Sequence, residues 1–161
     1  MLMGIDPGRN KCGIAILTNE GKEVFKDIFI TSNLSKKIEE LLNKYQIEKC
    51  ILGNGTYSDK VFNILDLLMD KKKIKFVEEE NTTYLAEQKY RKENPPLGLQ
   101  FLNKIVKFKP NKPLDDYVAV LLVKKYIDNG YWYKFLIRNK KSPHQRFKVW
   151  WGLLILYMTL N

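Results

Sequence analysis

The spacing of hydrophobic and polar positions changes several times along the chain, and each change marks a predicted element. The apolar runs 2–6 and 12–18 flank a PGRNK turn, which together predict a β-hairpin. Residues 23–30 alternate in part and predict a third strand. A continuous apolar run at 49–55, closed by glycines, predicts a strand of the kind that is buried in a parallel sheet, and residues 74–79 predict a fifth strand.

Helical spacing of apolar residues fills the stretches between these strands and after them. It predicts four helices, over 32–46, from Ser58 to the lysine run 71–73, from Asn81 or Thr82 to about Lys92, and over 114–128. Ser32 or Asn33 and Ser58 are predicted helix caps, and Gly130 is predicted to end the last helix. Strands that alternate with helices favour an α/β fold, here with a mixed sheet that begins as an antiparallel meander.

Charge is distributed unevenly over the 161 residues, whose net charge is +10. A basic excess suggests a polyanionic partner, although a solvated basic surface gives the same value. Residues 1–130 contain 22 basic and 18 acidic residues, whereas 131–161 contain six basic residues and no acid. We therefore predict one domain over 1–130, which is long enough to bury a core, and a C-terminal extension over 131–161.

A second acid-free stretch, residues 94–114, contains four prolines and predicts a loop. Its lysines are candidate contacts to a nucleic-acid backbone, with an ordinary solvated loop as the alternative. These lysines are Lys104, Lys107, Lys109 and Lys112.

The C-terminal extension mixes aromatic and basic residues, a combination that can stack on bases. It ends in a run of 12 uncharged residues that is too short to span a bilayer, so we expect no transmembrane segment. This run can lie at a membrane surface, pack on the domain or form a homodimer contact, and His144 is expected to be a loop residue. Cys12 and Cys50 fit buried small hydrophobes in a reducing, cytoplasmic location.

Acidic residues stand where predicted elements begin or end. Asp6 closes the first strand, Glu78 to Glu80 follow the fifth, and Asp115 and Asp116 open the last helix. Because sites in α/β sheets form outside the carboxyl ends of the strands, we expect these acids to converge. Clustered carboxylate oxygens suit Mg²⁺ or Mn²⁺. The structural alternatives are a turn aspartate and acids that favour the dipoles of helix starts.

Four segments in order resemble motifs of the YqgF group and the RuvC-like resolvases, within the RNase H-like superfamily. They are GIDPGRNKCGIAI, ILGNG, EEENTTYLAE and PLDDYVAVLLVKKYI. The resemblance covers about residues 1–130. It implies an RNase H-like α/β fold, in which a five-stranded mixed sheet begins as an antiparallel three-strand meander, continues with parallel strands and is flanked by helices.

The resemblance also implies a function. It implies a divalent-metal-dependent nuclease that acts on structured nucleic acid, either in pre-16S rRNA processing or on Holliday-junction-like DNA. By position, Asp6, Glu79 and Asp115 correspond to the catalytic, metal-binding acids, and Asp116 either adds a metal ligand or caps the helix.

Other residues near these acids are candidates for contacts with the substrate. The candidate phosphate contacts are Arg9, Lys11 and Thr56. Three glycines are expected to let the backbone approach a phosphate, with simple turn geometry as the alternative. They are Gly8, Gly53 and Gly55.

Two departures from the family motif leave a second function open. The motif's Arg-Leu pair is Glu80-Asn81 here. Because an arginine near the site neutralises phosphate charge, its loss favours a catalytically weak nucleic-acid-binding factor with the same fold. An actin-like ATPase or sugar kinase shares the opening hairpin, but those enzymes need two such domains.

Overall fold

The computed structural model describes residues 1–79, 82–94, 110 and 112–138, and for 131–138 only the course of the helix. The chain divides into two compact units, Met1–Ile127 and Asp128–Asn161. The role of the C-terminal extension and its homodimer contact stay predictions, since most of that segment, with His144, lies outside the described residues.

The first unit is built on a five-stranded sheet. Its strands are β1 (Leu2–Asp6), β2 (Lys11–Leu17), β3 (Glu23–Ile30), β4 (Lys49–Gly53) and β5 (Ile74–Val77). Their order is β3-β2-β1-β4-β5, in which β3, β2 and β1 form an antiparallel meander. Strands β4 and β5 then run parallel to β1. This order confirms the predicted five-stranded mixed sheet, in which an antiparallel three-strand meander is followed by parallel strands.

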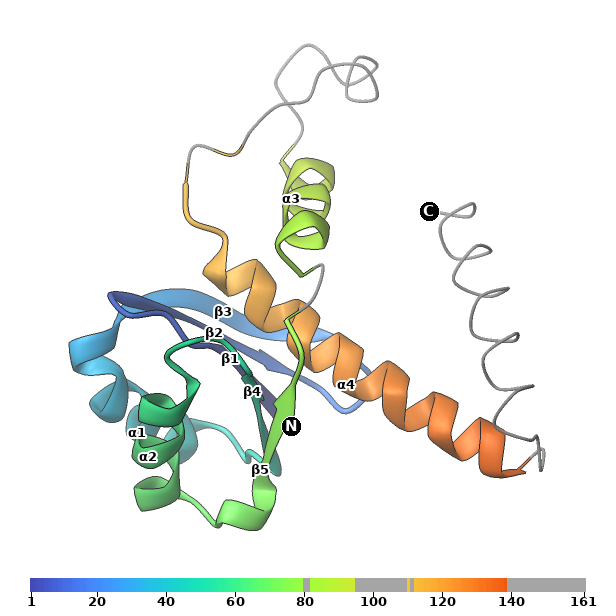
Figure 1. The fold of residues 1–161 in the computed structure, drawn as a ribbon, viewed down its shortest axis with the longest axis horizontal. Coiled ribbons are helices and arrows are strands. Elements are labelled where there is room, and N and C mark those ends of the chain that lie inside the picture. Colours follow the sequence, from blue (N-terminus) through green and yellow to red (C-terminus); the bar gives the residue numbers. More distant parts are fainter. Residues whose placement is uncertain (80–81, 95–109, 111, 139–161) are drawn as a thin grey trace. The chain divides into compact units, whose positions relative to one another are not determined.

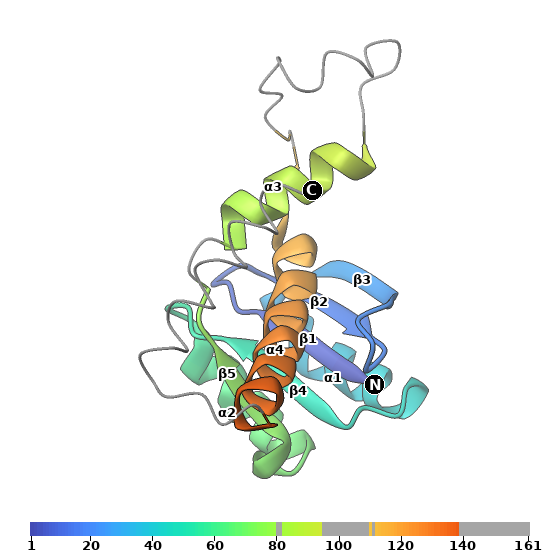
Figure 2. The same ribbon diagram turned by 90° about the vertical axis from the view of Figure 1, so that its right-hand side faces the viewer.

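Helices cover both faces of this sheet. They are α1 (Leu34–Lys44), α2 (Ser58–Leu68), α3 (Thr82–Glu93) and α4 (Asp115–Arg138), with short 3-10 turns η1 (Thr31–Asn33) and η2 (Lys71–Lys73). Helices α1 and α2 lie against one face, while the N-terminal part of α4 crosses the other (Figures 1 and 2). The central strands are therefore buried on both sides, which explains their continuous apolar sequences.

Alternate residues of the three central strands, β2, β1 and β4, enter two separate cores. On the face of α1 and α2, the β1 residues Met3 and Ile5 pack with Ile38 and Leu65. On the opposite face, Leu2 packs with residues of α3 and α4. The helical members of this second core are Ala86, Tyr90, Tyr117, Val118, Ala119, Val120, Leu122 and Val123. Because successive strand side chains point to opposite faces, these strands supply apolar residues to the helices on both faces of the sheet.

Glycines in the two central strands allow α4 to approach the sheet closely. A Cβ atom on Gly4 would overlap the backbone of Ala119, and one on Gly13 would overlap the backbone of Asp115. Only hydrogen atoms fit at these two positions. The glycines thus fix where the N-terminus of α4 crosses β1 and β2.

Several predicted helix ends are wrong. Helix α4 continues through Gly130 to Arg138. Among the described residues, Gly21 is the glycine with positive φ, so Gly130 lacks the left-handed conformation of a helix stop. Ser58 is the first residue of α2, whose N-cap is Tyr57, and the Asn33 side chain at the N-cap of α1 accepts no capping hydrogen bond. The lysine run forms the separate turn η2, which Asp70 caps.

Two further findings bear on the sequence predictions. None of the helices in the described ranges is long and apolar enough to cross a membrane. Cys12 and Cys50 are both buried and unpaired, as predicted for small core residues. Burial raises the pKa of Cys50 to about 12, which keeps that thiol protonated and unreactive.

Candidate active site

Asp6 stands at the centre of the sheet's carboxyl edge. It is the last residue of β1 and pairs with Gly13 on β2. Its side chain is partly buried. Because β1 has neighbours on both sides and helices on both faces, the backbone at Asp6 is held rigidly, and the sheet sets the position of this carboxyl.

Glu79 reaches the same edge from the loop after β5. The amide N–H of Gly55 donates a hydrogen bond of 3.0 Å to Glu79 Oε1, and the amide of Glu79 donates to Asn54 Oδ1 at 3.1 Å. The Thr82 hydroxyl, at the start of α3, donates to the carbonyl oxygen of Glu79 at 2.6 Å. Contacts from the loop after β4 and from α3 therefore hold the backbone of Glu79, and the Gly55 amide orients its carboxylate.

Asp115 is the first residue of α4, which packs on the face of the sheet opposite to α1 and α2. Its backbone lies against Gly13, the strand partner of Asp6. The close approach of α4 therefore carries Asp115 to the end of β1. The N-terminus of a helix also favours a negative charge, so this is a low-cost position for a carboxylate.

The charges of Glu79 and Asp115 influence the pKa of Asp6. Burial raises the pKa of Asp6 to about 7, and the charges of Glu79 and Asp115 add to this increase. A like charge has this effect on a carboxyl when it lies near it and water is scarce around it. Glu79 and Asp115 are therefore charged neighbours of Asp6, and the catalytic and metal-binding roles of the three acids stay predictions.

Asp116 has a different environment. Its side chain is only 8% exposed, and within the described chain its Oδ1 has no hydrogen-bond partner. Burial raises the pKa of Asp116, and a backbone hydrogen bond at Tyr117 and the charges of Lys112 and Lys26 oppose the increase. The charges that influence Asp116 are thus cations, whereas those that influence Asp6 are carboxylates.

Carboxylate oxygens, which these three acids supply, are the ligands that a hard divalent cation prefers. Three carboxyls that repel one another would be stabilised by a cation among them. In the part of the chain that the structure describes, no group of three His, Cys, Asp or Glu side chains is already arranged as a metal site. The acids are gathered, but they are not closed around a common point.

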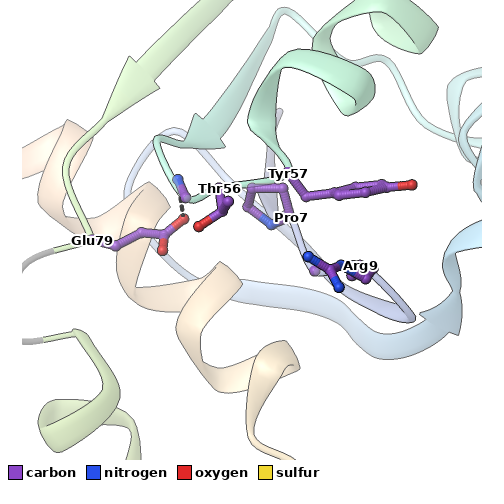
Figure 3. Close-up of a pocket in the computed structure, with 7 residues that line it drawn as sticks. Pro7, Arg9, Thr56, Tyr57 and Glu79 are labelled. Atoms are coloured by element: carbon purple, nitrogen blue, oxygen red, sulfur yellow. Dashed lines mark hydrogen bonds between the residues drawn. The ribbon is translucent and has the colours of Figure 1, made fainter.

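A pocket of about 430 Å³ lies beside Glu79. Its walls come from the β1–β2 turn, with Pro7 and Arg9, and from the β4–α2 loop, with Thr56 and Tyr57. In Figure 3, Glu79 and Thr56 lie on one side of Pro7, and Tyr57 and Arg9 lie on the other. The structure therefore brings the predicted phosphate contacts Arg9 and Thr56 to the same pocket as Glu79.

The other predicted contacts are less closely associated with the pocket. Lys11 is exposed at the start of β2. The Lys112 ammonium lies 5.0 Å from the ring centroid of Tyr90 and 5.6 Å from that of Tyr117, over the α3–α4 packing. Lys104, Lys107 and Lys109 lie outside the described residues.

The candidate glycines have identifiable structural roles. A Cβ atom on Gly53 would overlap the Glu79 carboxylate, and one on Gly55 would meet both its oxygens at 3.0 Å. A Cβ atom on Gly8 would overlap the carbonyl oxygen of Lys11 across the hairpin turn. Gly53 and Gly55 therefore make room for Glu79, and Gly8 allows a tight turn.

Sequence reasoning missed two residues of this site. Asn54 orients the backbone of Glu79, and Tyr57 lines the pocket. A signal for Asn54 was available, because an amide between two glycines after a buried strand is typical of a loop that bonds its neighbours. Tyr57 carries no spacing signal, since an aromatic at a helix start usually belongs to the core.

Comparison with known proteins gives limited matches, and no family model matches the chain. The uncharacterized protein YdcI of Bacillus subtilis (strain 168) is 30% identical over 112 residues, which are 62% of this chain and 16% of YdcI. The chain thus spans a small part of that relative. T. thermophilus RuvC, solved in complex with a Holliday junction substrate, is 13% identical with a TM-score of 0.47. That likeness covers 80% of this chain and 95% of the RuvC chain.

Proposed function

We propose that this protein is a divalent-metal-dependent nuclease that hydrolyses phosphodiester bonds in structured nucleic acid. The observation that carries the proposal is the placement of three acids at the same end of the sheet: Asp6 ends β1, Glu79 is held by the loop after β4, and the backbone of Asp115 lies against Gly13, the strand partner of Asp6. The RNase H-like strand order and the four ordered motifs support the same class. The proposal also includes three more specific statements: that the protein belongs to the YqgF group, that it acts in rRNA processing, and that it is located in the cytoplasm.

In this proposal, each element has a defined task. The sheet holds Asp6 in place, the Gly55 amide keeps the Glu79 carboxylate turned toward the pocket, and α4 supplies Asp115. Asp6, Glu79 and Asp115 would hold Mg²⁺ or Mn²⁺, which when bound neutralises phosphate charge and activates water. Across the pocket, Arg9 neutralises phosphate charge.

A cleavage assay tests this function. A four-way DNA junction and a 16S rRNA precursor are incubated with Mn²⁺ and with wild-type protein or Asp6→Asn. Loss of an outer-shell partner at a metal site already costs about 10–100-fold, so loss of a direct ligand is expected to reduce cleavage at least about 100-fold. The control is Asp66→Asn, an exposed aspartate on α2. Equal cleavage by wild type and Asp6→Asn would contradict the proposal.

A catalytically weak nucleic-acid-binding factor is the second candidate. Two observations favour it: the described residues hold no preformed three-ligand site, and Glu80-Asn81 replaces the motif's Arg-Leu. This candidate predicts binding that weakens steeply with salt concentration and no turnover with Mn²⁺ or Mg²⁺. The cleavage assay above therefore separates the two functions.

A further inference from the structure

We propose that the pocket beside Glu79 binds one unpaired nucleotide, with the Tyr57 ring as the platform on which its base stacks. The proposal rests on the proposed function and deepens it, because it names the kind of substrate that enters the site. It assigns to Tyr57 the selection of nucleic acid that has an unstacked nucleotide next to the reacting phosphate.

The size of the pocket fits this ligand. Its volume of about 430 Å³ lies toward the small end of the range for small-molecule sites, about 300–1,000 Å³. A pocket of that size accommodates one base with its sugar and phosphate, and it is too small for a base pair flanked by stacked neighbours.

The two ends of the pocket differ in chemistry, which orients the nucleotide. Glu79, with the Gly55 amide, forms the acidic end near Asp6, where the reacting phosphate belongs. Arg9 and Tyr57 form the other end (Figure 3). A base therefore lies over the aromatic ring, and a flanking phosphate lies beside the guanidinium.

Tyr57 is held as a rigid platform. It is partly buried and packs against the core between the sheet and helices α1 and α2. The Lys60 ammonium lies 4.9 Å from the ring centroid and 3.5 Å from the phenolic oxygen. A ring that is already fixed loses little conformational entropy when a base stacks on it, and the lysine adds positive charge near the backbone.

The geometry favours unpaired over paired substrates. A base inside a duplex is covered by its neighbours on both faces, so stacking on Tyr57 first requires its extrusion. A nucleotide in a loop, flap or branch point is already unstacked and meets no such cost. The pocket therefore predicts a preference for junctions, flaps and loops over continuous duplex.

The test uses the full chain and a stacking-sensitive base. Hairpin probes in DNA and RNA versions carry 2-aminopurine, whose fluorescence falls on stacking, either as a single unpaired nucleotide or base-paired in the stem. Binding is measured in EDTA, where metal-dependent cleavage cannot occur. Failure of the proposed nuclease activity and failure of this inference are therefore distinguishable.

The wild-type protein is expected to quench the unpaired probe, in its DNA or its RNA version, and to bind it more tightly than the paired one. Tyr57→Leu, which keeps an apolar side chain in the core, is expected to remove the quenching and weaken binding of the unpaired probe about tenfold. Tyr57→Phe, which keeps the ring, is expected to behave as wild type.

Tyr45 supplies a matched control. It is also partly buried against the same core, with the Lys44 ammonium 5.3 Å from its ring centroid, but it lies outside the pocket. Tyr45→Leu should leave binding unchanged. Absence of quenching by the wild type, or equal loss of both probes in Tyr57→Leu, would overturn the inference.

Discussion

At the scale of single residues, the central feature is a half-buried carboxyl with two acidic neighbours. Burial raises the pKa of Asp6 to about 7, and the charges of Glu79 and Asp115 add to the increase. Such an arrangement costs stability in the absence of a counterion, because charge is concentrated where water is scarce. Natural proteins retain a costly cluster of this kind mainly at functional sites.

Removing one of these charges is therefore expected to stabilise the protein when no divalent ion is present. Asp6→Asn should raise the unfolding temperature in EDTA by about 2–4 °C, which corresponds to about 1 kcal/mol for a chain of this size. Differential scanning calorimetry measures the change. Asp66→Asn, on the exposed face of α2, should leave the unfolding temperature unchanged. A lower unfolding temperature for Asp6→Asn would contradict the repulsion.

The positions of these acids were predictable from the sequence, since each stands at the end of a strongly patterned element. The sequence marked Gly55 and Asn54 as loop residues, but their pairing with Glu79 was not predictable, because they contact it only after β4 and β5 pair in parallel. Asp116 shows the same limit. Its place beside Asp115 suggested a shared site, but one residue of helix rotation buries its side chain, which is only 8% exposed.

At the scale of elements, a network of ion pairs joins β3 to α3. The Lys26 ammonium lies 3.0 Å from Glu93, and the Lys89 ammonium contacts both Glu23, at 2.7 Å, and Glu93. Burial works to raise the pKa of Glu93, but hydrogen bonds from Lys89 and Lys26 outweigh it and lower the pKa to about 2. This network fixes the helix that follows Glu79.

The network predicts a pH-dependent contribution to stability. A carboxyl whose pKa is lowered by folding stabilises the protein above its unfolded pKa of 4.5, and the contribution disappears as pH falls toward about 2. Glu93→Gln should therefore be less stable than wild type at pH 6, with the difference shrinking below pH 4.5. Urea unfolding across this range measures it, with Glu39→Gln on α1 as the control. A difference that stays constant with pH would contradict the role of the network.

Element bounds were predictable where the hydrophobic pattern is strong and less so at helix ends. The predicted strands at 2–6 and 23–30 match β1 and β3. The predicted end of α4 at Gly130 is wrong. A glycine often marks a helix end, but here the helix continues through Gly130, which is exposed. The intrinsic preference of one residue is small beside the packing of a long helix.

The continuity of α4 through Gly130 gives another prediction. A Cβ atom at this position would meet nothing within 4 Å. Alanine is favoured over glycine inside a helix by about 1 kcal/mol, so Gly130→Ala should increase helix content and stability by up to that amount. Circular dichroism and urea unfolding measure the two effects. If the helix ended at Gly130 in a left-handed conformation, the same substitution would destabilise it.

At the scale of the whole molecule, net charge alone gives an incomplete indication of the partner. The value of +10 suggests a nucleic-acid-binding protein, yet the domain over 1–130 carries 22 basic and 18 acidic residues. Its candidate site is acidic, with Arg9 as the cation that lines the pocket. The order of the acids along the chain, rather than the total charge, points to chemistry on a phosphodiester.

The central claim is that Asp6, Glu79 and Asp115 together hold a divalent ion, and a Mn²⁺ titration followed by electron paramagnetic resonance tests it most directly. The account predicts that wild-type protein binds Mn²⁺ and that Asp6→Asn and Glu79→Gln each weaken this binding at least about tenfold. Glu78→Gln, the exposed neighbour of Glu79, should bind as wild type. Equal Mn²⁺ affinity in wild type, Asp6→Asn and Glu79→Gln would contradict it.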